Sequence, residues 1–289
     1  MDKTGQNPEK QLVCAEAQAG ASNWEEFTPE VTQGFGFIAY KFSCPRPGSF
    51  HCSQTGLVFV VDGEATLQYR TVYWDVNLLE SSGSGAAGPL LNIECPEDAV
   101  RQLHFPHCET EPVQRSKKWL CVVNITDDGM SFIKPLDITS SHVVINVCSL
   151  SKYGLLERSI QYTRSVRCRV LLLLAPVNYR TRSQNLFVLM LPCNVVLDAV
   201  KSQHMTDIVI ETPTPLDLIR ERKYNVLCPE GNLIQPQEDD FDLDFGPNYH
   251  PMFQVRLVPN TERVTLTIQE EKKKNVWEQT IDLTGSGLL

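Results

Sequence analysis

The chain has 289 residues, of which 42% are hydrophobic and 21% are charged, and its formal net charge is −9. This composition is typical of a globular protein with one large or two modest domains, and it excludes wholesale disorder. The negative charge, and the lack of a basic stripe with interleaved aromatic residues, argue against nucleic acid and anionic membranes as partners.

Residues 1–23 are polar, rich in Gln and Ala, and lack a sustained hydrophobic period. We therefore expect them to form a flexible lead-in. They contain no apolar segment typical of a signal peptide, and the longest apolar run, Val170 to Ala175, is too short to span a bilayer. We expect a soluble, cytoplasmic protein, in which the ten cysteines are reduced and serve mainly as small apolar residues.

From Trp24 onward, short apolar or alternating runs recur between Gly, Pro, Asn and Asp residues. In residues 65–74 bulky and polar side chains alternate with the period of two that is typical of a strand. The bulky positions are Leu67, Tyr69, Thr71 and Tyr73. Residues 81–88 are rich in Gly and Ser but lack the GK[ST] ending of a phosphate-binding loop, so we expect a flexible surface loop there.

The second half continues in the same style. The best helix candidate is residues 195–203, because Val195, Val196, Ala199 and Val200 fall on one helical face. Near the end, two alternating runs flank the charged residues 269–275, which predicts a hairpin with a solvated tip. Many short strands with turns between them predict an all-β fold of two tandem β-sandwich-like subdomains with few short helices.

The stretch at residues 141–154 connects these two halves. Its first part is apolar like a buried strand, and its second part is polar and ends at Gly154, so a strand leads into a tight turn that contains Ser151. A hydroxyl in such a turn can attack the preceding carbonyl, that of Leu150, if a base takes its proton and donors stabilise the oxyanion. The alternative interpretation is a serine that only caps a turn.

Other chemistry has less support. His104, His107 and Cys108 could bind a metal together with Cys44, His51 and Cys52, but the sequence has no CxxC pair and no HExxH helix. It also has no G-x-S-x-G elbow and no Gly-rich nucleotide fingerprint. We expect no cofactor and no metal, and we keep a metal-dependent enzyme as an alternative.

Six short segments carry a resemblance to a known family. In chain order they are PGSFHC at 47–52, TGLVF at 55–59, GPLLNIEC at 88–95, QLHFPHCE at 102–109, DDGM at 127–130 and LSKYG at 150–154. Together they resemble the function-to-find domain (FIIND), in the version carried by fish NLR-type and caspase-recruitment proteins. The resemblance extends from about Trp24 to Leu283.

The resemblance implies a ZU-like subdomain at residues 24–150, followed by a UPA-like subdomain at residues 151–289. It implies a cytosolic innate-immune regulatory module of inflammasome type that is cut autocatalytically before the serine matching Ser151. The implied partners are proteins: a second copy through the UPA-like half, related NLR or caspase-recruitment proteins, and cytosolic dipeptidyl peptidases. No helical bundle of a death-fold domain follows, so we do not expect this chain to recruit a caspase itself.

The sequence departs from the family pattern at the implied cleavage site. Leu150 replaces a common Phe, and Asn124 replaces the His that acts as proton acceptor; an amide cannot act as a general base near neutral pH. Asp128 matches the acidic residue of the family, and His142 is the nearest imidazole in sequence. One hypothesis is a single self-cleavage between Leu150 and Ser151, with His142 or a water held by Asn124 and Asp128 moving the protons. The other is a non-cleaving scaffold or decoy that associates with related inflammasome proteins through its UPA-like half.

Overall fold

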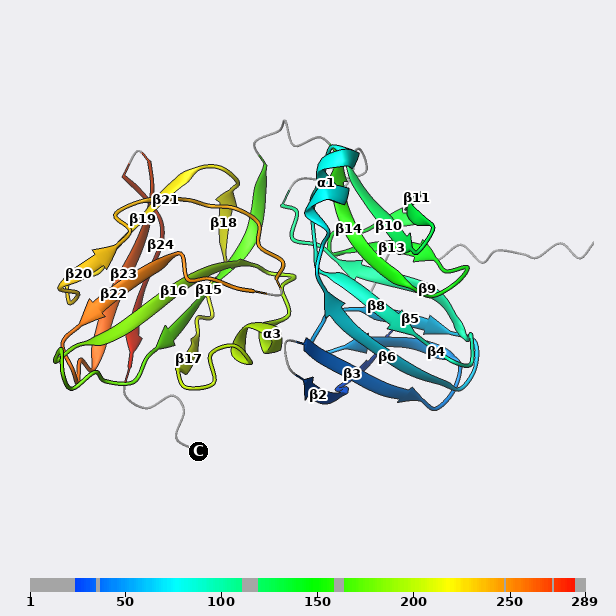
Figure 1. Ribbon diagram of the computed structural model, residues 1–289, viewed down its shortest axis with the longest axis horizontal. Helices are drawn as coiled ribbons and strands as arrows, with labels where there is room; N and C mark the ends of the chain where they lie inside the picture. The colour runs from blue at the N-terminus through cyan, green and yellow to red at the C-terminus, as the bar shows by residue number, and fades with distance from the viewer. Residues whose placement is uncertain are drawn as a thin grey trace, which may run out of the picture.

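The computed structural model describes residues 24–34, 37–110, 119–158, 164–246, 248–271 and 273–283. Strands account for 56% of the structure and helices for 5%, in several separate sheets, so the predicted all-β class is confirmed. Figure 1 shows two β-rich halves side by side, one containing the strands up to β14 and the other the strands from β15 onward.

The first half is built from two sheets, which we call sheets A and B. Sheet A has the order β1 (Glu25–Phe27), β4 (Gly48–Cys52), β5 (Val58–Val61), β9 (Val100–Pro106), β13 (His142–Asn146) and β12 (Asp137–Ile138). Sheet B has the order β11 (Gly129–Ile133), β10 (Leu120–Thr126), β14 (Lys152–Arg158), β8 (Leu90–Glu94), β6 (Ala65–Val72), β3 (Phe37–Cys44) and β2 (Glu30–Gly34), with β7 (Ser84–Ala86) beside β14. Apart from the parallel pair β1 and β4, the neighbours in both sheets that the structure describes are antiparallel.

The alternating residues of β6 show why these segments form a sandwich. Leu67, Tyr69 and Thr71 are buried, as the period of two predicts, whereas Tyr73 lies beyond the strand end and is 61% exposed. Leu67 and Tyr69 pack in one cluster with inward-facing residues of sheet A, such as Phe59 and Leu103. Removing such large apolar side chains from water stabilises the fold by roughly 1.5–3 kcal/mol each.

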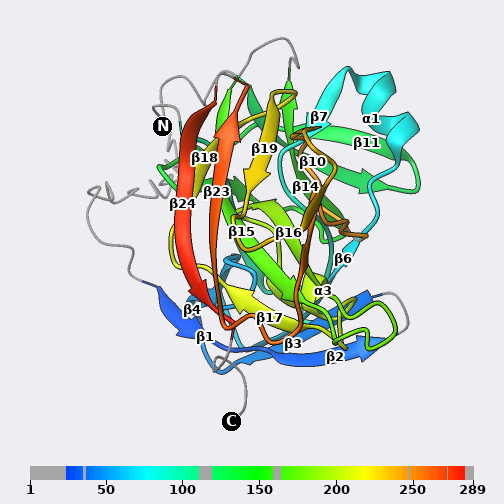
Figure 2. The same ribbon diagram turned by 90° about the vertical axis from the view of Figure 1, so that its left-hand side faces the viewer.

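The second half also contains two sheets, which we call sheets C and D. Sheet C has the order β17 (Ile208–Glu211), β15 (Ser165–Leu174), β16 (Gln184–Pro192), β22 (Phe253–Leu257) and β20 (Leu233–Gln235), with β18 (Leu216–Ile219) beside β15. Sheet D has the order β21 (Asp239–Asp240), β19 (Lys223–Leu227), β23 (Arg263–Glu270) and β24 (Lys274–Asp282). The predicted terminal hairpin is the pair of β23 and β24, and Figure 2 shows β24, β23 and β19 side by side.

The prediction of a flexible loop at residues 81–88 is wrong. The segment contains the end of a helix, α1 (Val76–Ser82), and then β7, whose Ser84 and Gly85 are buried. The Asp75 side chain caps α1 by accepting hydrogen bonds from two backbone N–H groups, and Gly83 ends it with a φ of 61°, a left-handed conformation that suits glycine. The helix is too short and too exposed to leave a period in the sequence, and β7 forms only because it pairs with β14.

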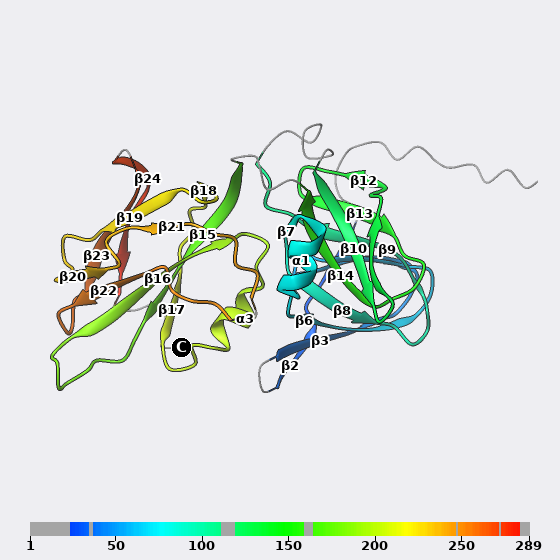
Figure 3. The same ribbon diagram turned by 45° about the horizontal axis from the view of Figure 1, so that its top comes forward.

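The second helix, α3 (Leu197–Lys201), lies within the predicted segment 195–203. Figures 1 and 3 show it at the boundary between the two halves. Its residues Ala199 and Val200 belong to the same buried cluster as Tyr40 and Tyr69 of the first sandwich. The halves are thus joined by apolar packing. Within the described ranges, no helix is long and apolar enough to cross a membrane.

Candidate functional site

Ser151 lies where the chain passes from one sheet of the first sandwich to the other. β13 belongs to sheet A and β14 to sheet B, and residues 147–151 form the bend between them. The Ser151 carbonyl accepts a hydrogen bond of 2.9 Å from the Ile93 N–H of β8, so the residue is anchored to sheet B. The bend therefore places the Leu150–Ser151 peptide bond at one end of the sandwich.

The main chain on the other side of this peptide bond is held by Tyr153. This tyrosine is 2% exposed, and its hydroxyl donates a hydrogen bond to the Ser149 carbonyl. Leu150 packs, half-buried, against the first core. The role of Tyr153 was not predicted from the sequence.

Asn124 is the side chain that contacts the Ser151 hydroxyl. It lies on β10, directly opposite Tyr153 in the register of β10 and β14, and it is 9% exposed. Its Nδ2 donates a hydrogen bond of 2.6 Å to Ser151 Oγ. Burial, and next the nearby Cys148 thiol, raise the pKa of Tyr153, so the phenol stays neutral and acts as a donor. Both groups donate hydrogen bonds here, and neither can take the hydroxyl proton.

The structure does not bring His142 to Ser151. His142 is the first residue of β13, and the strand alone carries it roughly 13 Å from Asn146 at about 3.3 Å per residue. Its Nε2 contacts the Gly56 carbonyl at 2.9 Å, and its Nδ1 contacts Ser141 Oγ at 2.8 Å. Both ring nitrogens are therefore engaged at the far end of the strand.

Asp128 is also separate from the nucleophile. It lies in the two-residue turn between β10 and β11, and its side chain is exposed. Across the described ranges it makes no hydrogen bond or ion pair with Ser151 or Asn124. Of the five residues predicted for this site, the structure brings together Ser151, Leu150 and Asn124 and leaves His142 and Asp128 outside.

His142 belongs instead to an aromatic cluster on sheet A. Its ring centroid lies 5.4 Å from that of Trp24, 6.3 Å from that of His51 and 6.4 Å from that of His104. Burial, and to a smaller extent the neighbouring His142, lower the pKa of His104 to about 4. Burial also lowers the pKa of His142, although its hydrogen bond to the Gly56 carbonyl raises it. The His104 and His142 rings are therefore neutral near pH 7.

This cluster should make the protein less stable in acid. The unfolded chain takes up protons on His104 and His142 below a pKa of about 6.5, whereas the folded chain resists them. We expect the free energy of unfolding to fall between about pH 6.5 and 4, by up to about 1.4 kcal/mol per pH unit for each histidine. Urea unfolding at several pH values tests this. His104→Gln should flatten the dependence, and an unchanged slope in this variant would contradict the explanation.

The other predicted ligands do not form a metal site. In the part of the chain that the structure describes, no group of three or more His, Cys, Asp or Glu side chains is arranged to hold a metal ion. Cys44, Cys52 and Cys108 are buried with apolar neighbours, and the nine described cysteines are free thiols. Burial raises the pKa of the Cys44 thiol to about 12, so this group is not a thiolate at neutral pH.

The strand that follows Ser151 completes the first sandwich. β14 pairs with β10 on one side and with β8 and β7 on the other, so sheet B continues to Arg158. Gly154 is needed in this strand because the Trp74 ring packs against it: an added Cβ would lie 2.4 Å from Trp74 Cζ2 and 3.1 Å from Leu90 Cδ1. The glycine of the LSKYG segment is thus explained by close packing.

Gly154→Ala should lower the free energy of unfolding by about 1–3 kcal/mol, because the methyl group overpacks a buried contact. The matched control is Gly63→Ala, where an added Cβ meets nothing within 4 Å, and there the change should stay within about 0.5 kcal/mol. Urea unfolding midpoints measure both. Equal effects of the two variants would contradict the packing explanation.

The function-to-find (FIIND) family model matches residues 35–163, and the UPA-FIIND domain model matches residues 166–281. The chain is 24% identical over 269 residues to the NACHT, LRR and PYD domains-containing protein 1 homolog of Danio rerio, covering 91% of this chain and 19% of that protein. It is 24% identical over 250 residues to NACHT, LRR and PYD domains-containing protein 1b allele 5 of Mus musculus, covering 83% and 21%.

A third relative matches a shorter part. NACHT, LRR and PYD domains-containing protein 1a of Mus musculus is 30% identical over 127 residues, which is 42% of this chain and 11% of that protein. The chain spans about a fifth of the length of the two longer matches. The two family models together cover most of the chain, in the same order as its two halves. The chain therefore belongs to the FIIND family.

Proposed function

We propose that this chain is a cytoplasmic innate-immune regulatory module that acts by binding related inflammasome proteins while its own halves stay covalently joined. The observation that carries the proposal is the hydrogen bond of 2.6 Å from Asn124 Nδ2 to Ser151 Oγ. Attack on the Leu150 carbonyl requires an acceptor for the hydroxyl proton at this place. A donor at this place leaves the proton on the serine and occupies a lone pair of the nucleophile.

The rest of the site supports the same conclusion. Tyr153 is a neutral donor, Asp128 lies in an exposed turn, and the ring nitrogens of His142 bond to Gly56 and Ser141. The nucleophile and its main-chain frame are present, but the described neighbours supply no base. Such a module can act as a scaffold or decoy through its UPA-like half, in which the UPA-FIIND model matches residues 166–281.

Denaturing gel electrophoresis of the recombinant chain tests the cleavage part of the proposal. We expect one band of full length, unchanged in Ser151→Ala. Two bands corresponding to residues 1–150 and 151–289, absent in Ser151→Ala, would instead establish single self-cleavage. For partner binding, we expect the intact chain to co-elute in size-exclusion chromatography with the matching segment of the Danio rerio relative. Separate elution at all concentrations would contradict the scaffold role.

A further inference from the structure

Three cysteines pack in one apolar cluster at the boundary between the two halves. Cys168 lies on β15 and Cys193 directly follows β16, both in the second half, whereas Cys108 lies two residues after β9 of the first half. Cys108 and Cys168 are buried members of this cluster, and the half-buried Cys193 packs against it. The other buried members that the structure describes lie between Val166 and Leu283. Cys108 thus extends from the first half into the core of the second.

Cys108 and Cys193 both bond to the main chain of Arg167 on β15. The Arg167 N–H donates a hydrogen bond of 2.7 Å to the Cys108 carbonyl, and the Cys193 N–H donates one of 2.9 Å to the Arg167 carbonyl. In a regular antiparallel pair, the N–H and C=O groups of one residue bond to a single residue opposite, whose Cα lies about 5.5 Å away. Here the two cysteines share that position.

The strand register on either side of Arg167 agrees with this placement. On one side, Cys168 lies opposite Pro192 of β16. On the other side, Val166 forms an isolated antiparallel bridge with Glu109. The residue after Pro192 and the residue before Glu109 are the two cysteines, so the chain beside β15 changes from the second half to the first between them. A disulfide joins residues whose Cα atoms are roughly 4.4–6.8 Å apart, and two residues that meet opposite a single residue are within reach of that separation.

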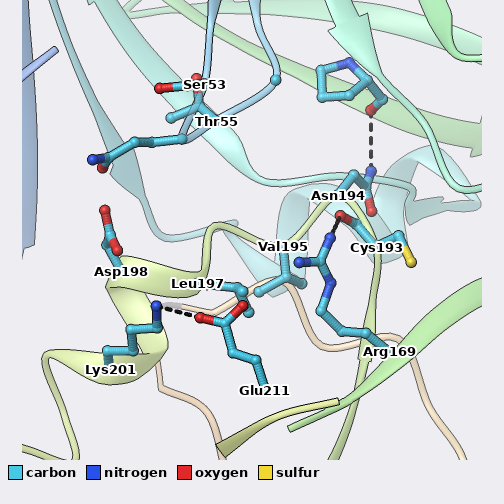
Figure 4. Close-up of a pocket in the computed structure, with 13 residues that line it drawn as sticks. Ser53, Thr55, Arg169, Cys193, Asn194, Val195, Leu197, Asp198, Lys201 and Glu211 are labelled. Atoms are coloured by element: carbon cyan, nitrogen blue, oxygen red, sulfur yellow. Dashed lines mark hydrogen bonds and ion pairs between the residues drawn. The ribbon is translucent and has the colours of Figure 1, made fainter. Parts of the chain in front are cut away.

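Cys193 is the cysteine of this cluster that an oxidant can reach. It is half-buried and lines a polar cleft of about 420 Å³ between residues 53–56 of the first half and residues 193–195 of the second. Arg169 Nη2 donates a hydrogen bond of 2.6 Å to the Cys193 carbonyl, and Figure 4 shows this contact. Burial raises the pKa of the Cys193 thiol, but Arg169 and Arg167 favour the thiolate and lower it. The reactive form of this thiol therefore has two cations near it.

Cys108 is placed to react with the oxidised form of Cys193. It is 5% exposed, and its pKa is raised by burial, then by Glu109 and by the Cys193 thiol, so the two sulfur atoms are close enough to interact. A buried thiol is protected from direct oxidation, but it can still attack an oxidised sulfur beside it. The pair thus combines an accessible thiol with a protected one.

We propose that Cys193 and Cys108 form a reversible disulfide that joins the two halves when the protein meets a peroxide. The Cys193 thiolate attacks one oxygen of hydrogen peroxide; the O–O bond breaks, hydroxide leaves, and the sulfur is oxidised to a sulfenic acid. The Cys108 thiol then attacks this sulfur as the S–O bond breaks, and its proton leaves with the hydroxide as water. A cellular thiol such as glutathione reduces the disulfide again.

This disulfide joins residues on either side of the Leu150–Ser151 bond. It therefore holds the halves together whether that bond is intact or cut, and the inference does not rest on the proposed function. Transient, redox-sensing disulfides are the kind that a reducing compartment permits.

Peptide mapping of the full chain tests the inference. The reduced protein is treated with hydrogen peroxide, unfolded in urea with a reagent that alkylates the remaining thiols, and digested with trypsin without reduction. Trypsin places the three cysteines in separate peptides, 102–115, 168–169 and 183–201. We expect peptides 102–115 and 183–201 to be joined only after peroxide treatment, and to separate on reduction. A bond from 183–201 to 168–169, or Cys108 that remains fully alkylated, would overturn the proposal.

Variants of the chain provide a second arm. Cys193→Ser should lose the joined peptide, whereas Cys148→Ser, which removes an exposed cysteine away from the cluster, should keep it. Arg169→Gln should slow formation of the joined peptide at least about threefold, and Arg169→Lys, which keeps the charge, should restore the rate. The mapping is done on the natural chain, so it remains decisive even if a variant fails to fold. A joined peptide that forms equally fast in folded Arg169→Gln would contradict the role assigned to this arginine.

Unfolding measurements show whether the disulfide strengthens the association of the halves. In the natural chain, peroxide should raise the urea midpoint of unfolding, because the new bond constrains the unfolded chain. In Cys193→Ser the same treatment should leave the midpoint unchanged. A midpoint that falls in the natural chain although the joined peptide has formed would show that the bond distorts the interface between the halves, which would contradict a stabilising bridge.

Discussion

Asn124→His should convert the chain into one that cuts itself between Leu150 and Ser151. Asn124 Nδ2 lies 2.6 Å from Ser151 Oγ, so an imidazole on the same strand position is placed to take the hydroxyl proton. Oγ then attacks the Leu150 carbonyl carbon and the C–N bond breaks. The ester forms as the freed amine takes the proton, and water hydrolyses it. A positioned base contributes roughly 10²–10⁴-fold, so we expect nearly complete conversion to fragments 1–150 and 151–289 on a denaturing gel.

Two controls make this result specific. Asn124→Gln keeps an amide and should stay uncut, and Asn124→His combined with Ser151→Ala should also give one band. After cleavage the fragments should still co-elute under native conditions, because β14 of the second fragment pairs with β10 from Lys152 to Glu157. A variant that folds with histidine at position 124 but remains whole would show that the missing base is not what keeps the bond intact.

Glu157→Gln should give the largest loss of stability of the substitutions considered. The Glu157 carboxylate is 6% exposed, and it forms ion pairs with the 7% exposed Arg164 and, at 3.4 Å, with Arg220 of the second half. Arg164 also lies over the Trp119 ring at 4.6 Å, while its Nε and Nη1 have no hydrogen-bond partner among the residues that the structure describes. A neutral amide leaves this buried guanidinium without a counter-charge, which costs about 3–5 kcal/mol.

The matched control is an exposed pair in the second half. Arg167 and Asp217 lie 3.2 Å apart, with side chains 56% and 46% exposed, so Asp217→Asn should change the free energy of unfolding by at most about 1 kcal/mol. Urea unfolding of both variants gives the comparison. Similar losses in the two variants would mean that burial does not set the strength of the Glu157 pair.

The elements that the sequence predicted well are those whose signal is local. The alternation in β6, the helix at α3 and the hairpin of β23 and β24 depend on neighbours within a few positions. α1 was missed because it is short, and β7 because a three-residue strand has no pattern of its own. β7 exists only through its pairing with β14, about 70 residues later in the chain.

At the candidate site, too, the sequence predicts local features but not which distant residues come together. Ser151 was found from a strand that leads into a turn, but His142 was proposed because it is only nine residues away in sequence. An extended strand carries its two ends apart, so nearness in sequence does not place this imidazole beside the nucleophile. Tyr153 lies two residues from Ser151, yet its hydrogen bond to the Ser149 carbonyl depends on how the bend folds back.

The sequence by itself determined the all-β class, because the period of its hydrophobic residues is a property of the chain alone. It also predicts Ser151 as a nucleophile, and the family resemblance implies that Asn124 replaces the usual base; both stay predictions. Only the tertiary structure decided that the Asn124 amide donates to Ser151 Oγ, that β14 stays in the first sandwich, and that a polar cleft lies between residues 53–56 and residues 193–195, 197, 198 and 201. These features join segments far apart in the chain, and the register between paired strands and the packing between halves set their geometry.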